Sequence, residues 1–312
     1  LEAPIRRAME EGAIGLSYGL EYAPGCTTEE IIQTGLLLRD YDHTLIAAHY
    51  RYDAERCLDS VREAIDVCAA TRIPFQFSHI GSCSAFRGSE SMEKALKLLE
   101  DAHADGVDIM ADCYPYTAFS ALIGTTVFDE GCFERWGADY SSLMVAEGPF
   151  RNQFCTPELF YKLRETAPNT RIIGFVMSEE GVDYALRHPM VMVGSDGRFA
   201  NGFGHPRGAG TFSRVLSRYV REKQLLTFEQ AIDKMTIMPA ERLHLRKKGR
   251  IQEGCDADIV ILDRNLIRDG ATFSDPLLSS EGIHAVIVNG EVCLRHGRYT
   301  ANAGRPIRRQ EI

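Results

Sequence analysis

The chain has 312 residues, of which 45% are hydrophobic and 25% charged, and this ordinary globular composition supplies enough apolar side chains for a large core. Lys and Arg number 35 against 44 Asp and Glu, so the net charge is −9 at pH 7; a short basic cluster at residues 246–250 is typical of a solvated turn, and we expect no nucleic-acid partner. No apolar run reaches the roughly 18 residues of a membrane-spanning helix, so we expect no membrane partner either.

The cysteines indicate a reducing compartment. Nine of them are scattered along the chain without a CxxC pair, which favours neither a disulfide framework nor a zinc knuckle, so we expect a cytoplasmic protein. The first residue is Leu1 rather than Met, no signal-peptide pattern is visible, and residues 1–12 already have a helical pattern. We therefore expect the chain to begin inside a fold.

Short apolar runs alternate with helical patterns through residues 1–248, which is typical of βα units around a parallel, barrel-like sheet. The predicted strands are residues 14–17, 45–49, 74–79, 107–112, 171–176 and 190–195. The predicted helices include residues 31–39, 53–70, 91–105 and 231–238. Capping signals mark three helix starts, at Thr27 with Glu30, Thr156 with Pro157, and Thr227 with Gln230.

Residues 249–312 change character. Segments 249–263 and 283–300 are predicted to form short strands joined by glycine-containing turns, and Asn289-Gly290 between apolar alternations is a strong hairpin signal. We expect a small β-domain here, after the barrel portion.

Two histidines and one aspartate follow predicted strands at the point where each strand ends. His49 closes the strand at 45–49, His79 closes the strand at 74–79, and Asp196 follows the strand at 190–195. The carboxyl ends of parallel barrel strands share one face, where active sites lie. Two imidazoles and a carboxylate suit a divalent metal of the zinc type, which would activate a water molecule.

Each of these residues also has a purely structural interpretation. A strand-end histidine is commonly a hydrogen-bonded structural residue, and an aspartate before glycine is a common turn former. It is the occurrence of three metal-competent residues at three strand ends that favours a site.

Three further segments could line a pocket beside these residues: residues 12–25, which place Tyr22 after a strand, and residues 112–120 and 197–210. The segment DCYPYTAFS, residues 112–120, places two tyrosines after a strand, and residues 197–210 form a glycine-rich loop suited to a mobile lid. The loop carries Arg207, and arginine is the natural bidentate partner of a carboxylate. The loop lacks the spacing of a phosphate-binding loop. The candidate substrate-binding residues are Tyr22, Tyr114, Tyr116, Ser120, His205 and Arg207.

Taken together, the motifs resemble the D-aminoacylase (N-acyl-D-amino-acid deacylase) branch of the metal-dependent amidohydrolase superfamily. They occur in the family's order: GAIGLSYGLEYAPG, AHYR, SHIG, DCYPY, SDG, HPRGAGTFSRVLSRYVRE, KMTIMPAERL, GRIQEGCDADIVILD, DPLLSSEGIHAVIVNGEV and GRPIRR. The resemblance runs from Leu1 to Arg309 and is loosest over residues 123–169. It implies an α/β fold: a partial (β/α)8 TIM-like barrel of the amidohydrolase type over residues 1–248 and a small β-sandwich portion over residues 249–312.

The resemblance also implies roles for individual residues. His49 and His79 match the two zinc-ligating histidines on the fifth and sixth barrel strands. Asp196 matches the aspartate on the eighth strand, which activates the metal-bound water, protonates the leaving amine and also contacts the metal. Tyr22, Tyr114, Tyr116, Ser120 and Arg207 fall in segments that line the family's substrate pocket.

Two departures from the family pattern matter. The HxH pair and the cysteine ligand of the family belong to an N-terminal portion that this chain lacks, so we expect weak activity or none until that half is supplied, covalently or as a second chain. That half and a homo-oligomer are the expected protein partners. Gly81 stands where the family often has a substrate-binding lysine, which leaves the preferred side chain open. Zinc is the expected metal, with iron, cobalt and manganese as alternatives.

The leading functional hypothesis is hydrolysis of the linear amide of an N-acyl-D-amino acid. A cyclic-amide hydrolase of the hydantoinase or dihydroorotase kind is the first alternative. A non-catalytic half-barrel that only pairs with another protein is the alternative from a different class.

Overall fold

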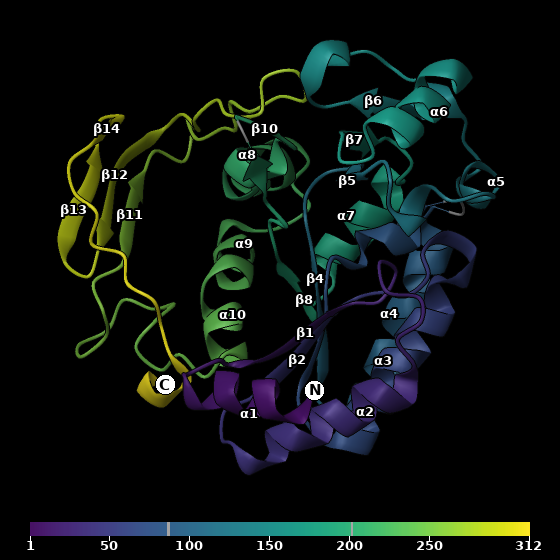
Figure 1. Ribbon diagram of the computed structural model, residues 1–312. Helices are drawn as coiled ribbons and strands as arrows, with labels where there is room; N and C mark the ends of the chain where they lie inside the picture. The colour runs from purple at the N-terminus through teal and green to yellow at the C-terminus, as the bar shows by residue number, and fades with distance from the viewer. Residues whose placement is uncertain (86–87, 201) are drawn as a thin grey trace.

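A five-stranded parallel sheet forms the centre of the molecule. The computed structural model describes residues 1–85, 88–200 and 202–312 (Figure 1). The sheet order is β1-β2-β3-β4-β8, and every neighbouring pair is parallel. Its strands are β1 (Gly15–Gly19), β2 (Leu45–His49), β3 (Phe75–Phe77), β4 (Ile109–Cys113) and β8 (Val191–Val193). Five of the expected strands therefore lie in one parallel sheet, as βα units require.

Helices follow the strands and cover the sheet with apolar faces. Thr27 and Glu30 form the predicted capping box, which satisfies two backbone N–H groups at the start of α2. The main core lies between these helices and the sheet and includes Phe75, Phe77 and Leu99, each at most 2% exposed. The helices around the parallel sheet are α1 (Glu2–Glu10), α2 (Thr28–Leu36), α3 (Cys57–Thr71), α4 (Ser89–Ala104) and α7 (Glu179–Arg187).

A second, antiparallel sheet is inserted between β4 and β8. It has the order β5-β7-β6, with β5 (Phe119–Leu122), β6 (Leu143–Val145) and β7 (Arg171–Gly174), and the helices α5 (Cys132–Trp136) and α6 (Pro157–Thr166) accompany it (Figure 1). The prediction that residues 171–176 form a strand of the barrel sheet is wrong. All four residues of β7 are buried, and a short, continuous apolar run shows burial without showing which sheet it joins.

The chain after β8 returns to helices and then forms the small β-region. The helix predicted over residues 231–238 ends early, because the backbone leaves the helical region at Thr236. The helices here are α8 (Arg207–Arg214), a π-helix (Val215–Glu222), α9 (Phe228–Met235) and α10 (Ile237–Arg242), and the short β9 (Phe199–Ala200) and β10 (Phe203–Gly204) precede them.

A four-stranded antiparallel sheet completes the chain. It consists of β11 (Ile259–Leu262), β12 (Ile283–Val288), β13 (Glu291–Arg295) and β14 (Arg298–Tyr299) in that order. The predicted hairpin is confirmed: Asn289 and Gly290 join β12 to β13 with φ of +50° and +81°. The exact domain boundary at residue 248 stays a prediction. No helix within the described ranges is long and apolar enough to span a bilayer.

Candidate active site

The carboxyl ends of the parallel strands open into a cavity of about 510 Å³. His49 is the last residue of β2, His79 lies two residues beyond β3, and Asp196 lies three residues beyond β8; all three line the cavity. His79 and Asp196 have φ of +42° and +44°, in the left-handed region. Such backbone costs about 1–3 kcal/mol for a non-glycine residue and is concentrated at functional sites.

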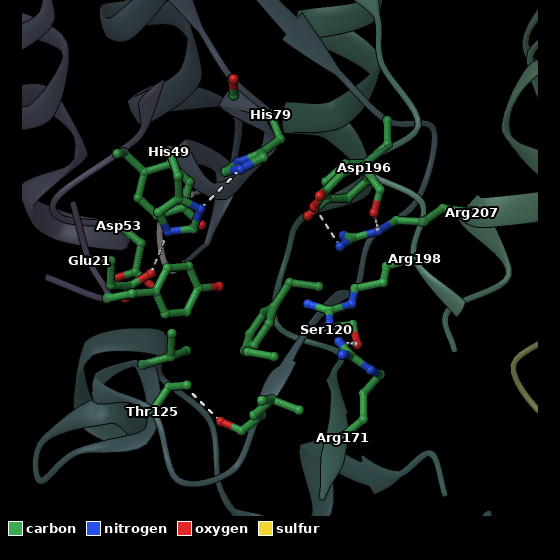
Figure 2. Close-up of a pocket in the computed structure, with 18 of the residues that line it drawn as sticks. Glu21, His49, Asp53, His79, Ser120, Thr125, Arg171, Asp196, Arg198 and Arg207 are labelled. Atoms are coloured by element: carbon green, nitrogen blue, oxygen red, sulfur yellow. Dashed lines mark hydrogen bonds and ion pairs between the residues drawn. The ribbon is translucent and has the colours of Figure 1, made fainter. Parts of the chain in front are cut away.

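The two histidines face one another. His49 Nδ1 lies 3.0 Å from His79 Nε2, and the rings are nearly edge-on (Figure 2). Burial lowers the pKa of His49 to about 4 and also lowers the pKa of His79, where the neighbouring His49 adds to the effect. Both imidazoles are therefore neutral at pH 7 and present a lone pair, which is the form that binds a metal.

A buried carboxylate cluster stands behind His49. Glu21 Oε2 lies 2.9 Å from His49 Nε2; when Glu21 is ionised it accepts a hydrogen bond from Nε2–H, and Nδ1 is then the lone-pair nitrogen. Asp53 accepts from Trp136 Nε1 at 2.6 Å and forms a 2.7 Å ion pair with Arg135, whose guanidinium lies 3.8 Å from Glu21. Burial raises the pKa of Glu21 to about 7, and Arg135 opposes that rise.

Sequence reasoning did not single out this cluster. A signal was present for Glu21, because it lies two residues after β1 at the same edge of the sheet as His49. Nothing in the sequence indicates that Arg135 and Trp136, from the inserted region, would reach Asp53.

Asp112, on the adjacent strand β4, supports His79. Its Oδ1 accepts from the backbone N–H of His79 at 2.9 Å, and its Oδ2 accepts from Gln76 Nε2 at 2.8 Å. Burial raises the pKa of Asp112, and these hydrogen bonds oppose the rise. The left-handed turn at His79 is thus held by a side chain of the adjacent strand.

Asp196 is held by Arg207. The Arg207 guanidinium lies 2.5 Å from Asp196 Oδ2, and its Nε donates to the Asp196 carbonyl at 2.9 Å. Arg207 is 5% exposed and lies over the Tyr114 ring, 4.4 Å from its centroid. The arginine was predicted to bind a substrate carboxylate; here it also orients the candidate base.

The other predicted substrate residues divide into two groups. Tyr22, Tyr114 and Ser120 line the cavity with Arg207. Tyr116 and His205 do not line it: they pack together, with ring centroids 5.2 Å apart. His205 Nε2 donates to the Ala118 carbonyl at 3.0 Å, and its Nδ1 accepts from the backbone N–H of Arg207 at 3.0 Å. In this structure both positions support the wall rather than face a ligand.

Two cavity arginines were missed by sequence reasoning. Arg171 is the first residue of β7, and Arg198 lies in the loop after Asp196; both line the cavity on the side away from the histidines (Figure 2). Arg171 belongs to the strand that was assigned to the wrong sheet, so its position in the cavity could not be foreseen. Of the glycine-rich loop predicted as a lid, residue 201 lies outside the described residues.

The donor set fits part of a zinc site. Within residues 1–85, 88–200 and 202–312, no group of three or more His, Cys, Asp or Glu side chains is arranged to hold a metal ion. However, the facing nitrogens of His49 and His79 lie 3.0 Å apart, close to the separation of two ligands on one tetrahedral zinc, and Glu21 supplies the outer carboxylate typical of a metal-binding histidine. His49 and His79 thus supply two ligands of the three or four that zinc requires, and a metal contact by Asp196 stays a prediction.

Comparisons with known proteins agree with this geometry. A family model described as "Amidohydrolase family" matches residues 175–294. N-acyl-D-aspartate deacylase of Alcaligenes xylosoxydans xylosoxydans is 32% identical over 93% of this chain and 58% of its own length. N-acyl-D-glutamate deacylase of the same organism is 33% identical over 99% of this chain and 64% of its own length. A dihydroorotase of Lactobacillus helveticus matches only 20% of this chain, at 33% identity.

Solved structures give the same result. N-acyl-D-glutamate deacylase from Bordetella bronchiseptica, complexed with zinc and a phosphonate mimic of the tetrahedral intermediate, superimposes with a TM-score of 0.84 at 29% identity, covering 95% of this chain and 63% of that one. A D-aminoacylase crystal structure has a TM-score of 0.84 at 28% identity, covering 96% and 64%.

The parallel sheet, its strand-end histidines and the matched family model define an amidohydrolase fold. Within that superfamily the chain belongs to the D-aminoacylase, or N-acyl-D-amino-acid deacylase, family. It spans about 60% of the length of the curated relatives it matches.

Proposed function

We propose that this chain carries part of the active site of a metal-dependent hydrolase that converts an N-acyl-D-amino acid into a D-amino acid and a carboxylate. The observation that carries the proposal is the His49–His79 pair facing the cavity that Asp196 and Arg207 also line. The two relatives named as deacylases of N-acyl-D-amino acids, which match nearly the whole chain, support the linear-amide substrate and its D configuration.

His49 Nδ1 and His79 Nε2 would hold the metal, and zinc suits these imidazoles. When bound at such a site, a divalent metal polarises an amide carbonyl and makes a nucleophile available from water at neutral pH. The remaining ligands would come from the rest of the protein that the relatives contain or from a second copy of the chain.

Asp196 is the candidate general base and acid. Its carboxylate reaches the cavity, and Arg207 holds it in one orientation. In the proposed reaction Asp196 accepts a proton from the attacking water and passes it to the leaving nitrogen as the amide bond breaks. The products are the acid and the free amine, and the proton that the new carboxylic acid releases leaves a carboxylate and a D-amino acid with a protonated amine.

The other side chains of the cavity would hold the substrate. Tyr22 and Tyr114 offer phenol donors, which are protonated at neutral pH, and burial further raises the pKa of Tyr114. Arg207 has one buried guanidinium nitrogen, Nη1, without a hydrogen-bond partner among the described residues, and this nitrogen would bind the α-carboxylate. The cysteines predict a reducing, cytoplasmic setting for this reaction, and the eight whose side chains the structure describes are free thiols.

The test uses this chain fused to the portion of a relative's sequence that lies outside the matched region. We expect N-acetyl-D-amino acids to be deacylated, and Asp196→Asn to lower turnover by about 10²–10⁴-fold, the usual contribution of a positioned acid–base group. The zinc content of the variant should stay within error of the parent.

A substrate panel separates the alternatives. Turnover of hydantoin or dihydroorotate but not of linear amides would replace the proposal with a cyclic-amide hydrolase. Full retention of every measured property in Asp196→Asn would favour a non-catalytic interaction protein.

A further inference from the structure

The cavity contains a buried cation without a counter-charge. Arg171 is 8% exposed, and its guanidinium points into the cavity (Figure 2). Its single hydrogen bond within the described chain is a long one, 3.5 Å, from Nη1 to Ser120 Oγ. No carboxylate among the described residues lies within ion-pair distance of this guanidinium; Glu147 accepts from the backbone N–H of Arg171 instead. Because a buried charge is costly without a partner, the site is one that an anion would complete.

A second guanidinium adjoins the first. Arg198 lines the same wall, has no ion pair within the described chain, and is close enough to disfavour the charged form of Arg171. Figure 2 draws both groups opposite the histidine pair, with Ser120 beside them. Two like charges held this close would both be stabilised by one shared carboxylate.

The carboxylates of the cavity are already engaged elsewhere. Glu21 bonds to His49, Asp53 is paired with Arg135, and Asp196 is paired with Arg207. A counter-charge for the buried Arg171 guanidinium would therefore come from a ligand, which the exposed Arg198 beside it would also contact. Arg207 differs from them, because the candidate base already neutralises it.

We propose that Arg171, Arg198 and Ser120 form a second carboxylate-binding subsite, which selects N-acyl amino acids carrying a carboxylate in addition to the α-carboxylate. This inference rests on the proposed function and deepens it. Arg207 would bind the α-carboxylate, and the neighbouring Arg171–Arg198 pair would bind the second one on the same side of the cavity (Figure 2). Position 81 is a glycine where the family often has a substrate-binding lysine. Arg171 and Arg198 would supply the positive charge for an acidic substrate in its place.

The test measures binding to the chain itself by titration calorimetry, so it does not depend on turnover. N-acetyl-D-glutamate is compared with its neutral isostere N-acetyl-D-glutamine, and N-succinyl-D-norvaline with N-succinamoyl-D-norvaline. The first pair places the second carboxylate on the amino acid and the other pair places it on the acyl group. We expect the acidic member of at least one pair to bind about tenfold tighter or more, and Arg171→Gln to reduce that gap to about threefold or less while leaving the neutral member unchanged.

Arg198→Gln provides a second variant, at an exposed loop position, that keeps the proposal testable if Arg171→Gln fails to fold. Arg39→Gln is the matched control: Arg39 donates to the Thr71 and Ala70 carbonyls, away from the cavity, and its loss should preserve the gap. The subsite is overturned if acidic and neutral ligands bind equally well or if none of them binds. It is also overturned if the difference in affinity persists in both Arg171→Gln and Arg198→Gln. Deacylation without a difference in affinity between acidic and neutral ligands would support the proposed function alone. A difference in affinity without deacylation would support only the subsite.

Discussion

At the scale of single residues, Glu21 determines how His49 presents its ring. When ionised, its carboxylate accepts a hydrogen bond from Nε2–H, and Nδ1 then faces His79 with its lone pair. An outer carboxylate of this kind orients a metal-binding histidine and raises its basicity. The positions of His49, His79 and Asp196 could be predicted from the sequence, because the ends of parallel strands must share one edge. The role of Glu21 could not, because it depends on a side-chain hydrogen bond across two strands.

Replacing Glu21 tests this orientation. In Glu21→Gln an amide faces His49 Nε2 in place of the carboxylate, and we expect zinc affinity to fall by about 10–100-fold, as for other losses of outer carboxylates. Competition against a chromophoric chelator measures the affinity. Glu63→Gln is the control, because Glu63 is a similarly buried carboxylate that pairs with Arg51 outside the cavity. Equal zinc affinity in parent and Glu21→Gln would contradict the assignment.

At the scale of elements, α9 is tied to β8 by a buried ammonium. Lys234 is 4% exposed, and its Nζ donates to the carbonyls of His188 at 2.5 Å and Val191 at 2.7 Å. The capping box that begins α9, at Thr227 and Gln230, was predicted from the sequence and is confirmed. The lysine contact was not predicted, because it depends on where α9 packs against the sheet. By anchoring α9 at the start of β8, Lys234 helps to hold the strand that leads to Asp196.

This lysine gives the protein a pH-dependent contribution to stability. Burial lowers the pKa of Lys234 from 10.5 to about 8. Between about pH 8 and pH 10.5 the unfolded chain keeps the proton that the folded chain has lost, so this group raises the free energy of unfolding with pH, by at most about 1.4 kcal/mol per pH unit. Below pH 8 the contribution is at its least favourable, and above 10.5 it is complete.

Urea unfolding of the parent and Lys234→Met at pH 7, 8, 9 and 10 isolates this effect. The two proteins share every other titrating group, so the difference in free energy of unfolding should shift in favour of the parent from pH 8 upward. A difference that stays constant, or that shifts in favour of the variant, contradicts the assignment.

At the scale of the whole molecule, the parallel sheet is confirmed and the inserted sheet is what sequence reasoning missed. The runs at 45–49, 74–79, 107–112 and 190–195 overlap strands of the parallel sheet, whereas 171–176 overlaps β7 of the antiparallel one. The apolar pattern and length of a segment indicate whether a strand is buried. Which neighbouring strand it pairs with depends on contacts between residues far apart in the chain. For this reason the position of Arg171 in the cavity could not be predicted from the sequence.

The partial donor set predicts how metal binding depends on the rest of the protein. With two imidazole ligands, the chain alone should retain well under one zinc per molecule after dialysis, and the chain joined to the remaining part of its relatives should retain about one or more. Elemental analysis with His49→Ala as the control measures this. One tightly held zinc in the chain alone, lost in His49→Ala, would show that the described residues suffice.

The inserted sheet carries part of the cavity wall separately from the parallel sheet. His49 and His79 stand on the parallel sheet, whereas Ser120 and Arg171 stand on β5 and β7, a separate layer with a core of its own. The candidate metal-binding histidines and part of the proposed second carboxylate subsite thus lie on different sheets, while Tyr22, Tyr114, Arg198 and Arg207 follow strands of the parallel sheet. We expect substitutions in β5 and β7 to change the proposed subsite without altering the strands that carry His49 and His79.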